Sequence, residues 1–196
     1  MYEKEILETY TRCNIKTFPI DCLAVIRGIG YTAKTYGDTV KSEEERKILM
    51  TGSPDALTYF EKRTIFYNER AHPRRIRFSL MHEVGHIILD TDSEDAADAF
   101  AASLLAPLIM VKKSRPFNVD GICQNFDVSV AMANRTIVEA MHYPIFTSGA
   151  RELFEYFKQF RPKKKETYRP TIRKEIYPDS WNELMLAKHD MDLYFY

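Results

Sequence analysis

The sequence predicts an α+β protein, with a small antiparallel or mixed sheet packed on one central helix and a mostly helical C-terminal half. Short segments of the first half, residues 29–36, 57–60 and 64–68, are rich in β-branched and aromatic residues, as strands are. Apolar residues recur at helical spacing over 78–105 and 119–141. Apolar residues make up 45% of the chain, which excludes a disordered protein.

The N-terminal part is expected to form two helices and a strand. Apolar residues recur at helical spacing within residues 1–18. Pro19 suits the first turn of a second helix over 19–27, which the glycines after it would close. Residues 29–36 then alternate as a strand does.

Residues 42–68 are expected to form one helix followed by two strands. Three glutamates after Ser42 favour the start of a helix over 42–50, because the helix dipole attracts negative charge there. Residues 52–55 form a turn rich in Gly, Ser, Pro and Asp. The segments 57–60 and 64–68 are either two separate strands or one hairpin.

Residues 82–86, His-Glu-Val-Gly-His, lie on the next expected helix. His82 and His86, four residues apart, project from the same helix face, where one Zn²⁺ can bind both imidazoles. The carboxylate of Glu83 can accept the proton of a metal-bound water as that water attacks a carbonyl. A buried core histidine would explain one of the two histidines, but not a pair with a glutamate between them. The pattern therefore predicts a zinc-dependent peptidase.

A catalytic zinc ion usually has three protein ligands, so a third is needed. A second expected helix follows after a short link, and such a link predicts antiparallel packing. Glu94 would then lie opposite His86, and Asp98 opposite His82. We expect Glu94 to be the third ligand and Asp98 to accept a hydrogen bond that fixes an imidazole tautomer. Asp98 is the alternative ligand, and Glu94 would then be a solvated charge at a helix N-terminus.

The stretch 78–107, in which H-E-V-G-H is followed by E-x-x-x-D-x-F-A-A-x-L-L-x-P, resembles the ImmA/IrrE family of metallopeptidases. The resemblance covers roughly residues 57–138 and implies a thermolysin-like zincin fold. It also implies a substrate and partner, a helix-turn-helix transcriptional repressor whose cleavage derepresses its target genes. One departure matters, because the family often has a glutamate where this chain has Ala96. If that glutamate were the essential ligand, Asp98 would have to serve in place of Glu94.

Three residues are candidates for stabilising the charge that develops on the substrate, and the sequence does not choose among Tyr67, His142 and Tyr143. His142 and His189 are also weaker candidate metal ligands. The strand 64–68 is expected to be a sheet edge that holds an extended peptide, because a free edge offers backbone hydrogen bonds. An ordinary core strand is the compatible alternative.

Four arginines between residues 70 and 77 are expected to form a solvated surface loop, with a patch for an acidic substrate or phosphate as the alternative. Residues 119–141 have a helix-turn-helix pattern, so a DNA-binding regulator is another alternative. Its second helix offers only Asn134 and Arg135 for base contacts, among mostly apolar residues, so direct DNA binding is not expected. A non-catalytic protein that binds or senses a repressor is a further alternative.

Residues 1–145 are expected to form the zincin domain, and 146–196 an appendage of one aromatic helix, a basic linker and a tail. The net charge is zero, with 28 basic and 28 acidic residues, which gives no general attraction to DNA or anionic lipid. No apolar run approaches the ~18 residues that span a bilayer, and the N-terminus is unlike a signal peptide. We therefore expect a cytoplasmic protein without a membrane partner, whose cysteines are small buried residues rather than metal ligands.

Overall fold

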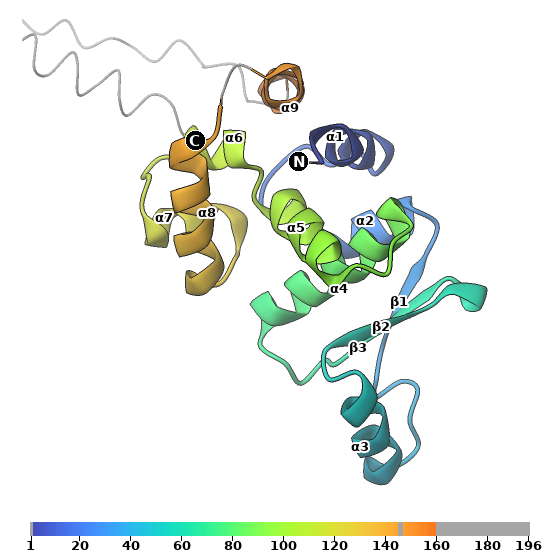
Figure 1. Ribbon diagram of the computed structural model, residues 1–196. Helices are drawn as coiled ribbons and strands as arrows, with labels where there is room; N and C mark the ends of the chain where they lie inside the picture. The colour runs from blue at the N-terminus through green and yellow to red at the C-terminus, as the bar shows by residue number, and fades with distance from the viewer. Residues whose placement is uncertain (1, 145–146, 160–196) are drawn as a thin grey trace, which may run out of the picture.

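The computed structural model describes residues 2–144 and 147–159. They form an α+β fold in which a small sheet lies at one end of a group of helices, as predicted (Figure 1). In chain order the elements are α1 (Glu3–Arg12), α2 (Cys22–Gly28), β1 (Thr32–Thr35), α3 (Glu43–Gly52), β2 (Ala56–Tyr59), the short 3-10 helix η1 (Phe60–Lys62), β3 (Thr64–Tyr67), α4 (Pro73–Leu89), α5 (Glu94–Leu105), α6 (Leu108–Lys112), α7 (Val119–Phe126), α8 (Val130–His142) and α9 (Ser148–Lys158).

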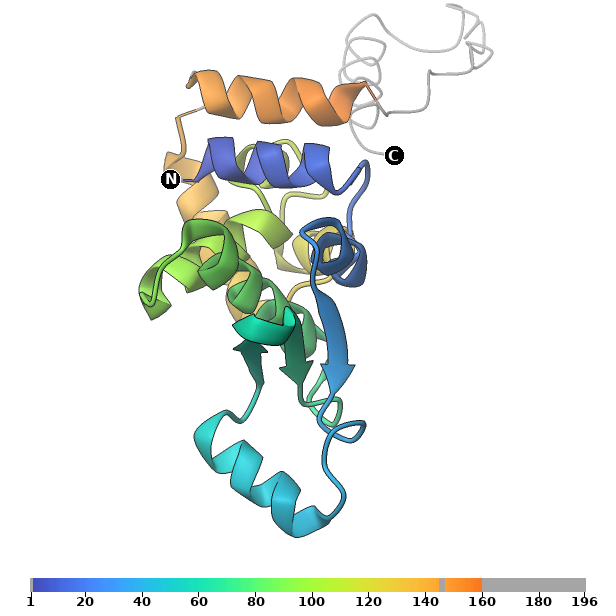
Figure 2. The same cartoon turned by 90° about the vertical axis from the view of Figure 1, so that its right-hand side faces the viewer.

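The sheet is mixed and has the strand order β1-β3-β2. β2 and β3 form an antiparallel hairpin, one of the two alternatives that the sequence left open, and Thr58 lies opposite Ile65 in it. β1 pairs in parallel with the other side of β3. The prediction that residues 64–68 form an edge is therefore wrong, because β3 is the central strand and β1 and β2 are the edges. Figure 2 shows the sheet below the helices, with α3 beyond it.

The first two helices are shorter than the sequence predicted. α1 ends at Arg12 rather than near residue 18. α2 begins at Cys22 rather than Pro19, because the Asp21 carboxylate accepts a hydrogen bond from the Ala24 N–H and so caps the helix there. A side-chain cap, and not the proline, sets the start of α2.

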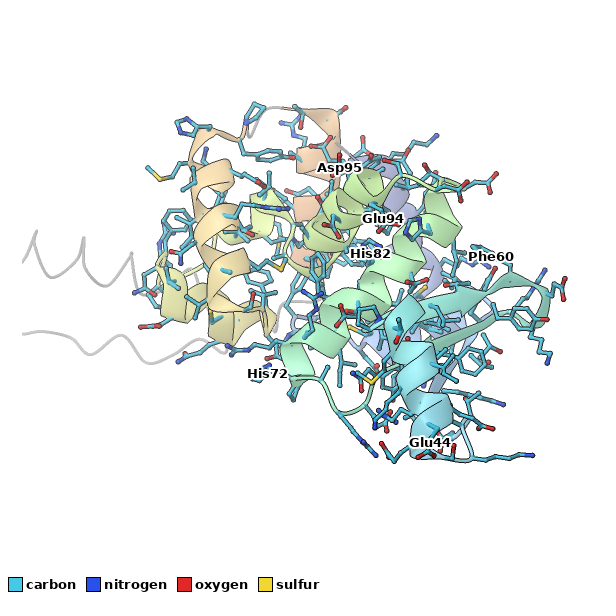
Figure 3. All side chains as sticks on the ribbon, turned by 60° about the horizontal axis from the view of Figure 1, so that its bottom comes forward. Glu44, Phe60, His72, His82, Glu94 and Asp95 are labelled. Carbon is cyan, nitrogen blue, oxygen red and sulfur yellow. The ribbon has the colours of Figure 1, made fainter. Side chains whose placement is uncertain are left out.

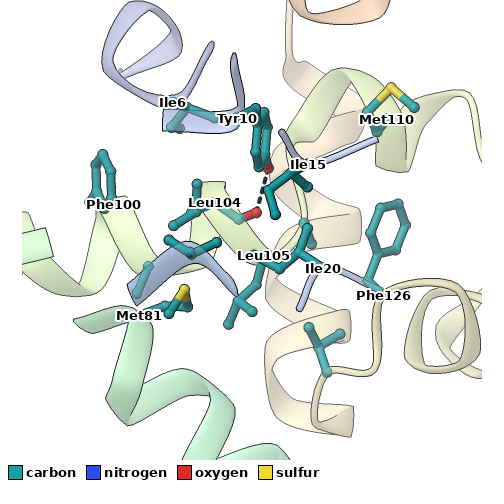
Figure 4. Packing of buried hydrophobic residues seen from close by; sticks show 14 of the residues in the cluster. Ile6, Tyr10, Ile15, Ile20, Met81, Phe100, Leu104, Leu105, Met110 and Phe126 are labelled. Carbon is teal, nitrogen blue, oxygen red and sulfur yellow. Dashed lines mark hydrogen bonds between the residues drawn. The ribbon is translucent and has the colours of Figure 1, made fainter. Parts of the chain in front are cut away.

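The core is formed by buried residues of α1, α2 and the helices α4 to α9, together with Ile65 of β3. Figure 4 shows part of it. The Tyr10 hydroxyl donates to the Leu104 carbonyl and thereby ties α1 to α5. Leu153 and Phe157 of α9 are buried in this same core. The boundary expected at residue 145 therefore does not separate α9 from the core. The expected basic linker and tail, with His189, lie outside the described residues.

The turn between α7 and α8 is attached to the N-terminal half of α4 by two arginines. Arg74 and Arg77 both pair with Asp127, at 3.1 and 3.3 Å. Arg77 also donates to the carbonyls of Ile20 and Asp127. These arginines are engaged in holding the fold together, so the expected alternative of a free basic patch does not describe them. Among the described residues, no helix is both long and apolar enough to cross a membrane.

Candidate metal centre

The centre is built on the antiparallel pair α4 and α5. α5 begins at Glu94 because the Ser93 hydroxyl accepts a hydrogen bond from the Ala96 N–H, which caps the helix. The two helices approach closely at Gly85, where an added Cβ would lie 3.0 Å from the Cα and the carbonyl oxygen of Ala97. A Cβ at this position would push the helices apart by a few tenths of an ångström, so the glycine favours the close approach that brings the side chains of one helix to those of the other.

Both histidine rings are oriented by a partner on the Nδ1 atom. Asp98 lies with its Oδ1 2.7 Å from Nδ1 of His82, and the Thr91 carbonyl oxygen lies 2.7 Å from Nδ1 of His86. A carbonyl only accepts, so Nδ1 of His86 carries the proton; an ionised Asp98 fixes the same tautomer in His82. Each neutral ring then presents a bare Nε2 lone pair, and the two Nε2 atoms lie 3.0 Å apart. Two lone pairs this close repel each other, and a metal ion bound between them would relieve that repulsion.

Glu94 completes a three-residue cluster with His82 and His86. Figure 3 labels His82 and Glu94 on the facing helices α4 and α5. A carboxylate oxygen of Glu94 lies 3.1 Å from Nε2 of His82, and the other lies 3.6 Å from Nε2 of His86. Ligands that bind one zinc tetrahedrally at about 2.0–2.1 Å are about 3.3 Å apart, so the cluster fits the ion. Asp98 contacts the opposite side of the His82 ring, so the geometry favours Glu94, rather than Asp98, as the third ligand.

Glu83 lies beside the cluster and lines the same cleft, which has a volume of about 430 Å³. The hydroxyl of Thr58 on β2 donates to Oε2 of Glu83 at 2.6 Å. The cleft therefore contains three side chains that could hold a metal ion and a carboxylate held next to them. This set can bind a metal ion and move a proton.

The wall opposite α5 is the loop between α3 and β2, which is held by several hydrogen bonds. The buried Tyr36 hydroxyl donates to the Ser53 carbonyl at 2.8 Å, and the Asn68 side chain donates to the Pro54 carbonyl at 3.1 Å. Burial raises the pKa of Tyr36 to about 12. Arg75 on α4 pairs with Asp55 through both carboxylate oxygens, and this pairing raises the pKa of Arg75.

The roles of Thr58, Tyr36 and Arg75 at the cleft were not expected from the sequence, in which Arg75 was only one of four surface arginines. Each acts through a partner from another element, and only the two-turn spacing between Arg75 and His82 on α4 was visible as a signal in the chain. Spacing could place Arg75 on the cleft face of α4, but it could not identify Asp55 as its partner.

The structure does not bring the three candidates for charge stabilisation to the cluster. Tyr67 packs against the core from β3. Tyr143 donates its hydroxyl to Glu3, and burial, with this hydrogen bond, raises the pKa of the phenol. His142 is the exposed last residue of α8. None of these three residues is among the described residues that line the cleft.

An H-E-x-x-H helix packed on a helix with an acidic ligand, beside a small sheet, is the arrangement of the zincin class of metallopeptidases. Residues 43–137 match the family model Peptidase_M78, described as the IrrE N-terminal-like domain. This match agrees with the resemblance to the ImmA/IrrE family seen in the sequence. The match begins at α3, earlier than the segment that the sequence motifs covered. No curated protein matches the chain.

Proposed function

We propose that the protein is a zinc-dependent endopeptidase that cleaves a helix-turn-helix transcriptional repressor and thereby derepresses its target genes. One observation carries the enzymatic part of this proposal. Two bare imidazole nitrogens and a carboxylate oxygen converge at zinc-binding distances in the cleft that Glu83 lines. The repressor as substrate is supported by the family resemblance alone.

His82, His86 and Glu94 would hold the zinc, and the ion would supply a Lewis acid that polarises the peptide carbonyl and acidifies water. Glu83 would accept the proton of the attacking water and then return it to the leaving nitrogen. Asp98 and the Thr91 carbonyl would keep both imidazoles in the metal-binding tautomer throughout. None of the three side chains that the sequence suggested for stabilising the developing negative charge lines the cleft among the described residues.

The edge strand β2 is the part of the sheet that would hold the substrate. Its side away from β3 has no strand partner among the described residues, and Ala56 at its start lines the cleft. An extended peptide would add to this edge through backbone hydrogen bonds. The repressor would therefore need an extended or locally unfolded segment at the cleaved bond.

The test is incubation of the zinc-loaded protein with the repressor encoded beside it, followed by measurement of product masses. We expect one main cleavage in the repressor, its loss when a chelator removes the zinc, and its return when zinc is added back. Glu83→Gln should bind zinc normally and lower the cleavage rate by at least about 100-fold. Glu44→Gln, on the exposed part of α3, is the matched control and should cleave normally.

Two outcomes would contradict the proposal. Full cleavage by Glu83→Gln at intact zinc occupancy would remove Glu83 as the base. Binding of the repressor without cleavage, unchanged by Glu83→Gln, would instead show a non-catalytic binding or sensor protein. A DNA-binding function gains no support from the geometry, because Arg135 on α8 pairs with Glu139 at 3.3 Å.

A further inference from the structure

We propose that Thr58 is a positioning residue, whose hydroxyl holds the Glu83 carboxylate in the orientation that its role as a base requires. The inference rests on the proposed function, because it concerns how the base of that reaction is held. It assigns a role to the edge strand β2 beyond that of a surface for substrate.

Helix geometry alone does not fix the Glu83 side chain. Successive residues of an α-helix point about 100° apart, so His82 faces α5 while Glu83 turns toward β2. A glutamate has three rotatable side-chain bonds, so its carboxylate can take many positions unless a partner holds it. In the described residues that partner is Thr58, which lies 25 positions earlier in the chain.

The direction of this hydrogen bond follows from the chemistry of the two groups. An ionised carboxylate can only accept, so the Thr58 hydroxyl is the donor, and the 2.6 Å separation is typical of a charge-assisted bond. Only Oε2 is engaged. No second hydrogen bond to this carboxylate occurs within residues 2–144 and 147–159, so Oε1 remains to contact a water or substrate in the cleft that Glu83 lines.

The strand fixes the position of the Thr58 hydroxyl, whereas the helix leaves the Glu83 carboxylate free to move. Thr58 lies directly opposite Ile65 in the hairpin, and Ile65 is fully buried in the core. Residues opposite each other share one face of the sheet, so this register keeps the Thr58 side chain on the face toward α4. The β-branched side chain of threonine also restricts rotation about its first bond.

The test compares four zinc-loaded proteins, which are the wild type, Thr58→Val, Thr58→Ser and Glu83→Gln. Valine keeps the branched shape without the donor, whereas serine keeps the donor. The probe is acetohydroxamate, whose two oxygens bind zinc and whose acidic proton needs a carboxylate acceptor beside the metal. Calorimetric titration measures its affinity without any need for the natural substrate.

We expect Thr58→Val to weaken acetohydroxamate binding by about 10- to 100-fold, the range of one hydrogen bond to a charged group. Thr58→Ser should restore most of the affinity, and Glu83→Gln should lose at least as much as Thr58→Val. Zinc affinity should be the same in all four proteins, because none of the substitutions removes a zinc ligand. A residue that only stabilised the fold would instead lower the unfolding temperature and leave acetohydroxamate binding by the folded protein unchanged. Against the repressor, Thr58→Val should lower kcat and leave KM unchanged.

The outcomes separate this inference from the function on which it rests. Wild-type affinity in Thr58→Val, alongside weakened binding by Glu83→Gln, would overturn the role of Thr58 and leave the base in place. Equal losses in Thr58→Val and Thr58→Ser would also overturn it, because the hydroxyl would then not be the cause. Unchanged acetohydroxamate binding by Glu83→Gln would overturn both the role of Thr58 and the role of Glu83 as the base. Thr58→Ala replaces Thr58→Val if the valine variant does not fold.

Discussion

Replacing Gly85 by alanine tests the close packing of α4 on α5, on which the whole metal cluster depends. The new Cβ would lie 3.0 Å from both the Cα and the carbonyl oxygen of Ala97. These are backbone atoms, so no side chain can rotate away to make room. The two helices would have to separate by a few tenths of an ångström, and Glu94, one turn before Ala97, would move away from the histidines of α4.

Two effects of opposite sign determine how much Gly85→Ala changes the free energy of unfolding. Alanine stabilises a helix interior by about 1 kcal/mol relative to glycine. Overpacking of a well-packed site costs about 1–3 kcal/mol. We therefore expect Gly85→Ala to lower the free energy of unfolding of the metal-free protein by up to about 2 kcal/mol, and the displaced Glu94 to weaken zinc binding by about tenfold or more.

Urea unfolding of the metal-free protein measures the free energy of unfolding, and competition with a chromophoric chelator measures the zinc affinity. Gly52→Ala is the matched control, because no atom lies within 4 Å of the position that its Cβ would take. It should leave zinc binding unchanged and be neutral or slightly stabilising. If Gly85→Ala were as stable as Gly52→Ala and bound zinc as tightly as the wild type, the helices would not be in the contact described.

Two further predictions concern the partners that hold the cleft. Asp98→Asn should weaken zinc binding by about 10- to 100-fold with little change in the stability of the metal-free protein, because the carboxylate that orients His82 is lost; unchanged zinc affinity in the chelator assay would contradict that role. Burial raises the pKa of Tyr36 to about 12, from 10.0 in the unfolded chain. The folded state therefore holds this proton more tightly, so the resulting stabilisation is complete below pH 10 and is lost as the pH rises toward 12. Tyr36→Phe should be less stable at neutral pH by about 1 kcal/mol, since the hydrogen bond to Ser53 is lost, and should lose less stability than the wild type above pH 10 in urea unfolding. Parallel losses in the two proteins would exclude Tyr36 as a source of the alkaline sensitivity.

The metal cluster could be predicted because its members are close in sequence. Helical geometry places His82 and His86 on one face whatever the rest of the chain does. The short link after α4 then leaves antiparallel packing as the simple solution, and that packing brings Glu94 and Asp98 back along the same face. Ala96 raised a doubt about this assignment, and only the distances in the folded chain favour Glu94.

The sheet could be predicted only in part, because strand order depends on contacts between distant segments. The hairpin of β2 and β3 was visible from two apolar segments joined by a short turn. Nothing in residues 29–36 shows that β1 pairs in parallel with the far side of β3, 32 positions later. Without that pairing β3 has a free side, so the sequence pointed to the wrong edge strand and could not reveal Thr58 as the partner of Glu83.

The strand order explains how β2 can serve the reaction in two ways at once. Side chains of a strand point perpendicular to the sheet, whereas its backbone N–H and C=O groups point along the plane of the sheet. Thr58 can therefore hold Glu83 on the face toward α4, while the side of the same strand that has no strand partner in residues 2–144 and 147–159 stays free for a peptide. A central strand such as β3 offers no free side, because β1 and β2 occupy both. Only an edge strand that lies over the H-E-x-x-H helix can both hold the base and bind an extended substrate beside it.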